Sequence, residues 1–278
     1  MRIIEGKNFT DERSLFKEKN LEIVNCSFDI GESPLKESMN ISAKKCKFLY
    51  KYPFWYSFDV TISDCVFEEM SRSAIWYSSK MLIKNTIFNA PKFFRRAKDI
   101  TIIDSTFSNG DETFWQSENI NVRKTKFKGN YVFKNCRNIV IEDVTIDGNY
   151  SFDGSMNIVV KNCILNSKDA FWNTENVVVE NSVINGEYVG WNSKDLIFKN
   201  CKIISHQGFC YIDGLTLLNC EINESDLIFE YCKNINADVK GHIISILNPT
   251  SGSIIYEECD EIILNQYHEN EGIVIKKR

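Results

Sequence analysis

The sequence lacks three features that mark common functional classes. Its formal net charge is −5 and its pI about 5.4, so it has no positive excess of the kind that binds nucleic acid or anionic lipid. No stretch approaches the roughly 20 apolar residues that span a bilayer, and residues 1–16 hold no apolar segment behind a basic start. We therefore expect a cytoplasmic protein that binds neither nucleic acid nor membranes. Sugars and other small polar ligands are not excluded.

Metal-binding and disulfide patterns are also missing. The ten cysteines include no C-x-x-C pair, and no secretion signal accompanies them. His242 and His268 have no partners at metal-ligand spacing. The sequence predicts neither a cofactor nor a metal site.

What the sequence does contain is a repeat. The segments LEIVNCSF (21–28), VTISDCVF (60–67) and IVVKNCIL (158–165) follow one template, I-x-I-x-x-C-x-F. The first apolar residue of each copy is called the marker here. The markers are Leu21, Ile41, Val60, Met81, Ile100, Ile120, Ile139, Ile158, Val177, Leu196, Leu215, Ile235 and Ile262. They are 19 to 21 residues apart until a last step of 27.

Upstream positions are equally regular. The residue six before each marker is apolar at every coil except Gly190, and the residue one before it is often Asn or Asp. Alternation within the template indicates a strand, and Asn or Asp tolerate the left-handed conformation of a sharp corner. A second strand would carry the apolar position and a third the Cys-x-Phe pair. Three strands in about 19 residues are typical of one coil of a parallel β-helix, a solenoid that buries its interior by stacking coils.

A leucine-rich repeat is the alternative, because its core motif also matches the template. That fold needs a helix or 3₁₀ turn in the rest of each repeat. GNYVFKNCRN (129–138) and GNYSFDGSMN (148–157) are instead aromatic and strand-like, which favours the β-helix. We predict an all-β, single-domain protein over 1–278 with about 13 coils of 19–21 residues. Residues 1–14 would form an N-terminal cap, 15–241 the regular coils, and 242–278 irregular last coils and a C-terminal cap.

The cysteines have a structural interpretation in this fold. Six occupy the template's Cys position, where they would form a small interior ladder. Cys210 stands outside this ladder, within eight residues of His206 and Asp213. A nucleophilic thiol needs a nearby base, but a half-exposed thiol beside an unrelated histidine is the stronger interpretation. Whether Cys210 is reactive is left open.

The tryptophans gather at one position of the repeat. All five lie in what we call the outer column, the residue five before each marker. That column also holds Arg95, Lys134 and Asp153, while its neighbour stays apolar, so alternation places the tryptophans outside on one face. The predicted ligand-binding residues of this face are Trp55, Tyr56, Trp76, Tyr77, Trp115, Tyr150, Trp172, Asn173, Trp191, Asn192 and Tyr211.

Two functions fit such a face. Indoles at coil spacing, beside phenols, amides and carboxylates, suit a binding cleft for a carbohydrate or small polar ligand. The alternative is a noncatalytic scaffold whose aromatic face binds another protein or a second copy of the chain. Oligomeric state is left open.

If the site is catalytic, two chemistries are available. A glycosidase needs two carboxyl groups roughly 5 to 10 Å apart, which Glu112, Asp153 and Asp169 would supply. A lyase acting on uronic acids needs cations and a base, and Arg95, Arg96 and Lys134 are the candidates. For any one of these carboxylates, a solvated surface charge is the simpler role.

Several runs of this face resemble a known family. KYPFWYS, IWYS, FFRR, GNYSFDG, KDAFWN and GEYVGWNS are similar to those of the bacterial family classified as domain of unknown function 3737, over about residues 5 to 255. The resemblance implies a right-handed, pectin-lyase-like β-helix. It leaves activity open, because fold does not imply function.

Overall fold

The computed structural model describes residues 1–265 and 271–278, so His268 lies outside the described residues. The chain divides into two compact units, the N-terminal unit Met1–Val140 and the C-terminal unit Ile141–Arg278, which are described separately. Every regular element among the described residues is a strand, and the chain forms a parallel β-solenoid of about fourteen turns. The predicted fold class, an all-β parallel β-helix, is confirmed.

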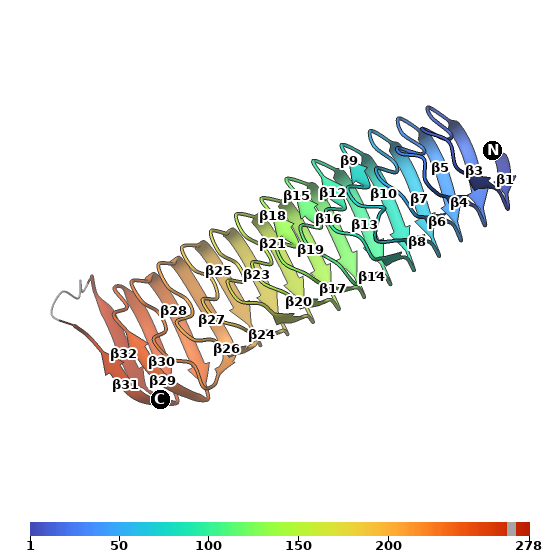
Figure 1. Ribbon diagram of the computed structural model, residues 1–278. Helices are drawn as coiled ribbons and strands as arrows, with labels where there is room; N and C mark the ends of the chain where they lie inside the picture. Colours follow the sequence, from blue (N-terminus) through green and yellow to red (C-terminus); the bar gives the residue numbers. More distant parts are fainter. Residues whose placement is uncertain (266–270) are drawn as a thin grey trace. The chain divides into compact units, whose positions relative to one another are not determined.

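The N-terminal unit contains three kinds of strand, whose coils lie side by side in Figure 1. Long strands carry the markers: β1 (Arg2–Glu5), β3 (Lys19–Val24), β5 (Met39–Lys44), β7 (Phe58–Ser63), β10 (Ser79–Lys84), β13 (Lys98–Ile103), β16 (Glu118–Arg123) and β19 (Arg137–Glu142), which runs past Val140. Short strands follow the Cys position: β2 (Asn8–Phe9), β4 (Ser27–Phe28), β6 (Lys47–Phe48), β8 (Val66–Phe67), β11 (Ile87–Phe88), β14 (Thr106–Phe107) and β17 (Lys126–Lys128). The third kind is β9 (Ile75–Trp76), β12 (Phe94–Arg95), β15 (Phe114–Trp115) and β18 (Phe133–Lys134).

The C-terminal unit continues the same repeat. Its long strands are β21 (Met156–Lys161), β23 (Glu175–Glu180), β25 (Lys194–Lys199), β27 (Asp213–Ile222), β28 (Lys233–Lys240), β30 (Gly252–Tyr256) and β32 (Ile273–Lys277). Its short strands are β20 (Thr145–Asp147), β22 (Ile164–Asn166), β24 (Val183–Asn185) and β26 (Lys202–Ile204), and β29 (His242–Leu247) pairs with β31 (Glu258–Ile263) as a separate sheet.

Parallel pairing in register stacks like residues on like. Leu21, Ile41 and Val60 are Cα partners on successive coils, and each is at most 2% exposed. Seven phenylalanines of the N-terminal unit form a continuous interior stack with ring centres 4.2 to 5.2 Å apart: Phe9, Phe28, Phe48, Phe67, Phe88, Phe107 and Phe127. Each aromatic pair adds about 1 kcal/mol to the stabilisation from buried area.

The corners of the coils use left-handed backbone, as the Asn and Asp positions predict. Asn119 has φ 57° and Asn176 has φ 58°. Their side chains form ladders between coils, such as the amide of Asn200 donating to Asn181 and that of Asn219 donating to Asn200. These bonds satisfy polar groups that three corners per coil would otherwise leave to water.

The predicted interior positions are confirmed, with one compensation. The apolar position six before the marker is fully buried at Phe94, Phe171 and Phe209, for example. At Gly190 it has no side chain. Phe198 of the same coil contacts Phe171 and Phe209, with ring centres 6.0 and 5.3 Å apart, and so packs against the coils on either side. The space beside the glycine is filled by Ile212, Leu196 and Phe209, whose side chains lie within 3.5 Å of the position of an added Cβ.

The two ends of the repeat differ from each other. Residues 1–14, predicted as a cap, contain β1 and β2, which pair in register with β3 and β4. Ile262 is wrong as the last marker: it lies on β31 and is 39% exposed. The main sheet instead continues from Ile235 to Gly252 and then to Ile273.

Candidate functional site

The outer column lies on the outside of the coils, as predicted, except at Cys210, which is fully buried. In β9, β12, β15 and β18 the first residue is buried and the second is half-buried, so Trp76, Arg95, Trp115 and Lys134 follow one another in register. All five tryptophans are half-buried. Alternation along the strand is the cause, since the partner of each outward side chain is an inward Phe or Ile.

In the N-terminal unit the faces of the indoles are occupied by neighbours. The rings of Trp55 and Trp76 stack with centres 5.3 Å apart and planes 7° from parallel. The guanidinium of Arg95 lies 5.0 Å from the centre of Trp76 and 4.6 Å from that of Trp115, and Lys134 Nζ lies 5.6 Å from Trp115. Rings and cations therefore alternate along this part of the column and pack against one another.

The polar edges of these indoles are occupied as well. Trp55 Nε1 donates to the carbonyl oxygen of Ser73 at 2.5 Å, and Trp76 Nε1 donates to that of Lys92 at 2.9 Å. In the next column, Tyr56 and Tyr77 stack with ring centres 5.0 Å apart. These contacts occupy the indoles of the N-terminal unit, while Tyr56 and Tyr77 stay exposed beside them.

Three predicted catalytic residues of this unit have local partners. Glu112 forms an ion pair with Lys92 at 3.5 Å, and both border a cavity of about 120 Å³ with Arg95. Arg96 Nε donates to Gln116 Oε1 at 3.0 Å. Lys134 lies over the ring of Tyr131, 4.3 Å from its centre.

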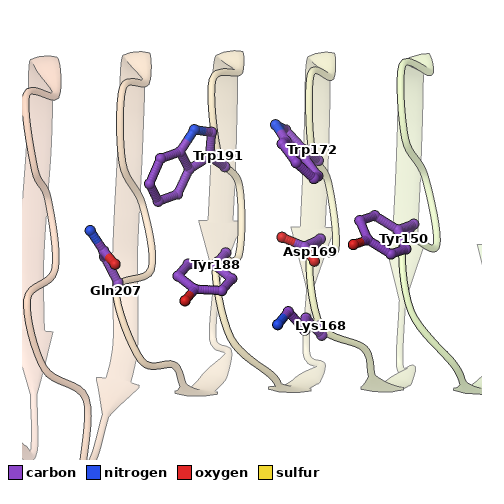
Figure 2. Close-up of a pocket in the computed structure, with 7 residues that line it drawn as sticks. All are labelled: Tyr150, Lys168, Asp169, Trp172, Tyr188, Trp191 and Gln207. Carbon is purple, nitrogen blue, oxygen red and sulfur yellow. The ribbon is translucent and has the colours of Figure 1, made fainter.

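The C-terminal unit holds a larger cavity of about 420 Å³, shown in Figure 2. We call it the C-terminal cavity. Its lining residues come from the corners of four successive coils, between β20 and β27: Tyr150, Lys168, Asp169, Trp172, Tyr188, Trp191 and Gln207. Four aromatic rings and three polar side chains thus line one opening.

The cavity exists because the aromatic stack is interrupted. Trp172 stacks on Tyr150, with centres 5.7 Å apart and planes at 22°. Trp191 instead contacts Tyr188 edge-on and Tyr211 at a tilt. No ring contact joins Trp172 to Trp191 within residues 141–265, and neither indole nitrogen has a hydrogen-bond partner among the described residues. Figure 2 shows Trp191 turned away from Trp172.

Asp169 is the buried carboxyl of this cavity. It is 4% exposed, and its Oδ2 has no hydrogen-bond partner among the described residues. Burial raises the pKa of Asp169 above its ordinary value. Lys168 and the Tyr150 hydroxyl lower this pKa by less than burial raises it, and the carboxylates of Glu187 and Asp153 add smaller increases. A buried carboxyl with a raised pKa in an aromatic cavity is a common feature of functional sites.

The remaining polar groups of the cavity are held by neighbours. Lys168 Nζ forms an ion pair with Glu187 at 3.1 Å. Gln207 Nε2 donates to Glu230 Oε2 at 2.9 Å, which leaves the amide oxygen of Gln207 as an acceptor for a ligand.

Predicted residues beside the cavity form a separate row. Asn192 Nδ2 donates to Asn173 Oδ1 at 2.8 Å, and Asn173 Nδ2 lies 3.5 Å from Asp153 Oδ1. Tyr211 is exposed and its ring lies 5.4 Å from that of Tyr231. Of the predicted catalytic carboxyls, Asp169 lines the C-terminal cavity and Asp153 does not; Glu112 belongs to the N-terminal unit.

Lys168, Tyr188 and Gln207 line the cavity but were not predicted as site residues. A signal for two of them exists in the sequence. Tyr188 and Gln207 lie eight residues before their markers, the same position as Tyr150 and Asp169. The backbone is left-handed at Tyr150, Asp169, Tyr188 and Gln207, with φ between 45° and 57°. These four residues form a second column, which lines the cavity together with Trp172 and Trp191 of the outer column.

Cys210, His206 and Asp213 do not form a catalytic cluster. Cys210 is fully buried, and burial raises its pKa to about 12. His206 Nδ1 lies 2.7 Å from Asp226 Oδ1, and Asp213 accepts a hydrogen bond from Asn234. A Cys–His nucleophile built from these residues is therefore excluded, because the thiol faces the interior. The six template cysteines are all buried, which confirms the interior ladder.

Within 1–265 and 271–278, His, Cys, Asp and Glu side chains nowhere gather in threes that would hold a metal ion. The same part of the chain contains no helix with the length and apolar character needed to cross a bilayer.

The fold and repeat define a parallel β-solenoid with an aromatic outer face. The chain belongs to the family described as "Protein of unknown function (DUF3737)", which matches residues 2–276. The family expected from the sequence is therefore confirmed, over a longer range than the resemblance covered. No curated protein matches the sequence.

Several solved structures are similar to the chain. A mutant tailspike protein of E. coli bacteriophage HK620, in complex with a pentasaccharide, is 7% identical with a TM-score of 0.36, over 98% of this chain and 70% of that chain. The A-module of the Azotobacter vinelandii mannuronan C-5 epimerase AlgE4 is 12% identical with a TM-score of 0.28, over 98% and 89%. The plasmid-mediated fluoroquinolone resistance protein QnrB1 is 11% identical with a TM-score of 0.24, over 80% and 89%. Such distant similarity assigns no activity to the chain.

Proposed function

We propose that the chain binds a carbohydrate-type ligand in the C-terminal cavity. One observation carries this proposal: the aromatic stack is interrupted between Trp172 and Trp191, directly beside the buried carboxyl of Asp169. A ring of the ligand would enter this interruption. In the N-terminal unit, the outer column is filled instead by its own side chains, such as Arg95 between Trp76 and Trp115.

The chemistry of the lining supports a sugar. The apolar face of a pyranose packs on an indole, and its hydroxyls need donors and acceptors at the rim. The cavity supplies two indole N–H groups, the Tyr188 hydroxyl, the Gln207 amide oxygen and Asp169. Its volume of about 420 Å³ lies in the ordinary range for small-ligand sites, roughly 300 to 1,000 Å³.

The lining favours binding over hydrolysis. Glycosidases use two carboxyl groups roughly 5 to 10 Å apart, one on each side of the scissile bond. Asp169 is the only carboxyl among the seven residues that line the cavity. The proposed lyase cations Arg95, Arg96 and Lys134 belong to the other unit. We therefore propose a binding protein, with no reaction at this cavity.

A scaffold function is the second candidate, and the N-terminal unit favours it. Tyr56, Phe58 and Tyr77 are 51%, 44% and 37% exposed, and Tyr56 and Tyr77 stack as one surface. Exposed aromatic surface of this kind often forms protein interfaces. A dimer in solution that protects tryptophan from acrylamide quenching would support this function, and a monomer with quenchable tryptophan would exclude self-association.

The binding proposal is tested by titrating the chain with cello-, malto-, N-acetylchito- and galacturonate oligosaccharides while following tryptophan fluorescence and heat. We expect at least one series to bind. Trp172→Ala should weaken that binding about tenfold or more, since it removes a stacking wall. Trp76→Ala, which removes an indole of the same column in the N-terminal unit, is the matched control and should leave the affinity unchanged. Absence of binding across the panel, or equal losses in the two variants, would refute the proposal.

A further inference from the structure

The C-terminal cavity has an excess of acid over base. The ammonium of Lys168 forms an ion pair with Glu187 and also acts on Asp169, so one cation is shared by two carboxyl groups. Asp169 Oδ2, in contrast, is buried beside the cavity with no hydrogen-bond partner among the described residues. An unpartnered carboxyl oxygen in a buried position is unfavourable unless a ligand supplies a donor or a positive charge.

The walls around this acid suit a cation. Ammonium and guanidinium groups bind over the faces of Trp and Tyr rings, most strongly where water is excluded. Four such rings line the cavity, those of Tyr150, Trp172, Tyr188 and Trp191. Aromatic walls with one carboxylate are a recurrent way of holding an amine.

The N-terminal unit shows the same column with its cations in place. There, Arg95 lies between the rings of Trp76 and Trp115, and Lys134 lies against Trp115. In the C-terminal unit the outer column supplies no Lys or Arg from Asp153 to Glu230; the intervening residues are Trp172, Trp191 and Cys210. The rings are retained around an opening, and the one Lys of the lining, Lys168, lies over Tyr188, 5.1 Å from its ring centre, and not in the outer column.

We infer that the ligand of the C-terminal cavity is a cationic amino sugar, a glucosamine-type unit with a free amine. The inference rests on the proposed carbohydrate function and specifies its ligand class. The apolar face of the sugar packs on Trp172, and its ammonium pairs with the carboxyl group of Asp169. This contact brings a second cation to the carboxyl groups of the ring-lined space.

Neutral sugars would bring no further cation to Asp169, which shares Lys168 with Glu187. An N-acetylated unit has an amide in place of the ammonium, so it offers one weak donor and no charge. A neutral glucose unit offers a hydroxyl. Both would stack on the indole, but neither compensates the carboxylate, and selection among the three therefore depends on Asp169.

The test compares three β-1,4-linked tetrasaccharides at about pH 6, where a sugar amine is protonated. They are the glucosamine tetramer (chitosan tetraose), the N-acetylglucosamine tetramer and the glucose tetramer (cellotetraose). With the wild-type chain we expect the glucosamine tetramer to bind about tenfold or more tightly than the N-acetylglucosamine tetramer. Asp169→Asn keeps the size of the side chain and removes its charge, so this preference should vanish while the neutral sugars keep their affinity. Asp195→Asn, an exposed carboxylate outside the cavity, is the control and should keep the preference.

The outcomes separate this inference from the function on which it rests. Equal binding of chitosan and neutral tetrasaccharides would overturn the amino-sugar assignment and leave the carbohydrate function standing. A preference for the glucosamine tetramer that persists in Asp169→Asn would also overturn it, because another residue would then recognise the charge of the sugar amine. Absence of binding by all three sugars, with no binding in the wider panel, would overturn both.

Discussion

The guanidinium of Arg95 lies 4.6 Å from the centre of the Trp115 ring, and the opposite side of the same group faces Trp76. No part of this arrangement requires a ligand, because the cation and both rings belong to the N-terminal unit. It shows what the outer column does when its residues are complementary: successive coils pack their outward side chains into a continuous stack.

Arg95→Ala should therefore destabilise the N-terminal unit. We expect the free energy of unfolding to fall by about 1 to 2 kcal/mol, since two cation–π contacts in a half-buried position are lost. Urea unfolding followed by circular dichroism measures this loss. Arg96→Ala, which removes a neighbouring exposed arginine that contacts Gln116, should have a smaller effect. Equal losses would show that the indole stack adds little stability.

Gly190 is expected to resist substitution for two separable reasons. Its φ is +75°, and a Cβ there would lie 3.1 Å from Ile212 Cδ1 and 3.2 Å from Leu196 Cδ2. Gly190→Ala should carry a backbone penalty of about 1 to 2 kcal/mol and an added packing penalty.

Gly6→Ala separates these two contributions in the same unfolding measurement. Gly6 has φ +65° with no atom within 4 Å of an added Cβ, so this variant should carry the backbone penalty alone. If Gly6→Ala destabilised the chain as much as Gly190→Ala, interior crowding at residue 190 would be disproved.

Asp169 should make stability depend on pH. Its pKa is raised in the folded chain, so its contribution is fully present below the unfolded-state pKa and is lost as pH rises through the folded pKa. Between about pH 4 and pH 7, wild type should lose stability relative to Asp169→Asn, whose amide does not titrate. Chemical unfolding of both proteins across this range checks the sign. A difference that stays constant, or that moves in favour of wild type, would contradict the burial of this carboxyl.

The thiols should differ in reactivity according to burial. Nine of the cysteines are buried, and burial raises the pKa of Cys136 and Cys210 to about 12 and that of Cys163 to about 11. Cys259 alone is half-exposed. At about pH 8 the native chain should expose one thiol to a disulfide reagent, against ten after unfolding. Cys259→Ser should remove the native reaction, and rapid labelling of Cys210 in the native chain would disprove its burial.

The inside and outside of each coil could be predicted from the sequence, because a strand alternates its faces with a period of two residues. Phe94 and Arg95, adjacent in the chain, lie on opposite faces as predicted. The cysteine ladder follows from the same register. These features depend on position along a strand, which spacing alone determines.

The last coils could not be predicted in the same way. The true continuation after Ile235 is Gly252, whose absent side chain hides the marker position from any hydrophobic pattern. Ile262 has the right pattern, EIIL, but lies on a strand of the separate β29–β31 sheet. A hydrophobic pattern therefore indicates Ile262 and misses Gly252.

The C-terminal cavity was only partly predictable for a different reason. Trp172 and Trp191 are separated by the ordinary repeat of the coils, yet their rings do not stack, because side-chain rotation and not chain spacing sets ring contact. The burial of Asp169 likewise arises from the packing around a corner, which the sequence shows only as one charged residue among aromatic ones.

The central claim is that the opening between Trp172 and Trp191 receives the ring of a sugar. A crystal structure of the chain with the glucosamine tetramer, or with the tightest-binding saccharide of the panel, tests it most directly. We predict density for one sugar ring against the free face of Trp172, with a polar group of that ring within hydrogen-bond distance of the Asp169 carboxyl group. A saccharide bound at the Tyr56–Tyr77 surface, or anywhere else with this opening filled by water, would contradict the account.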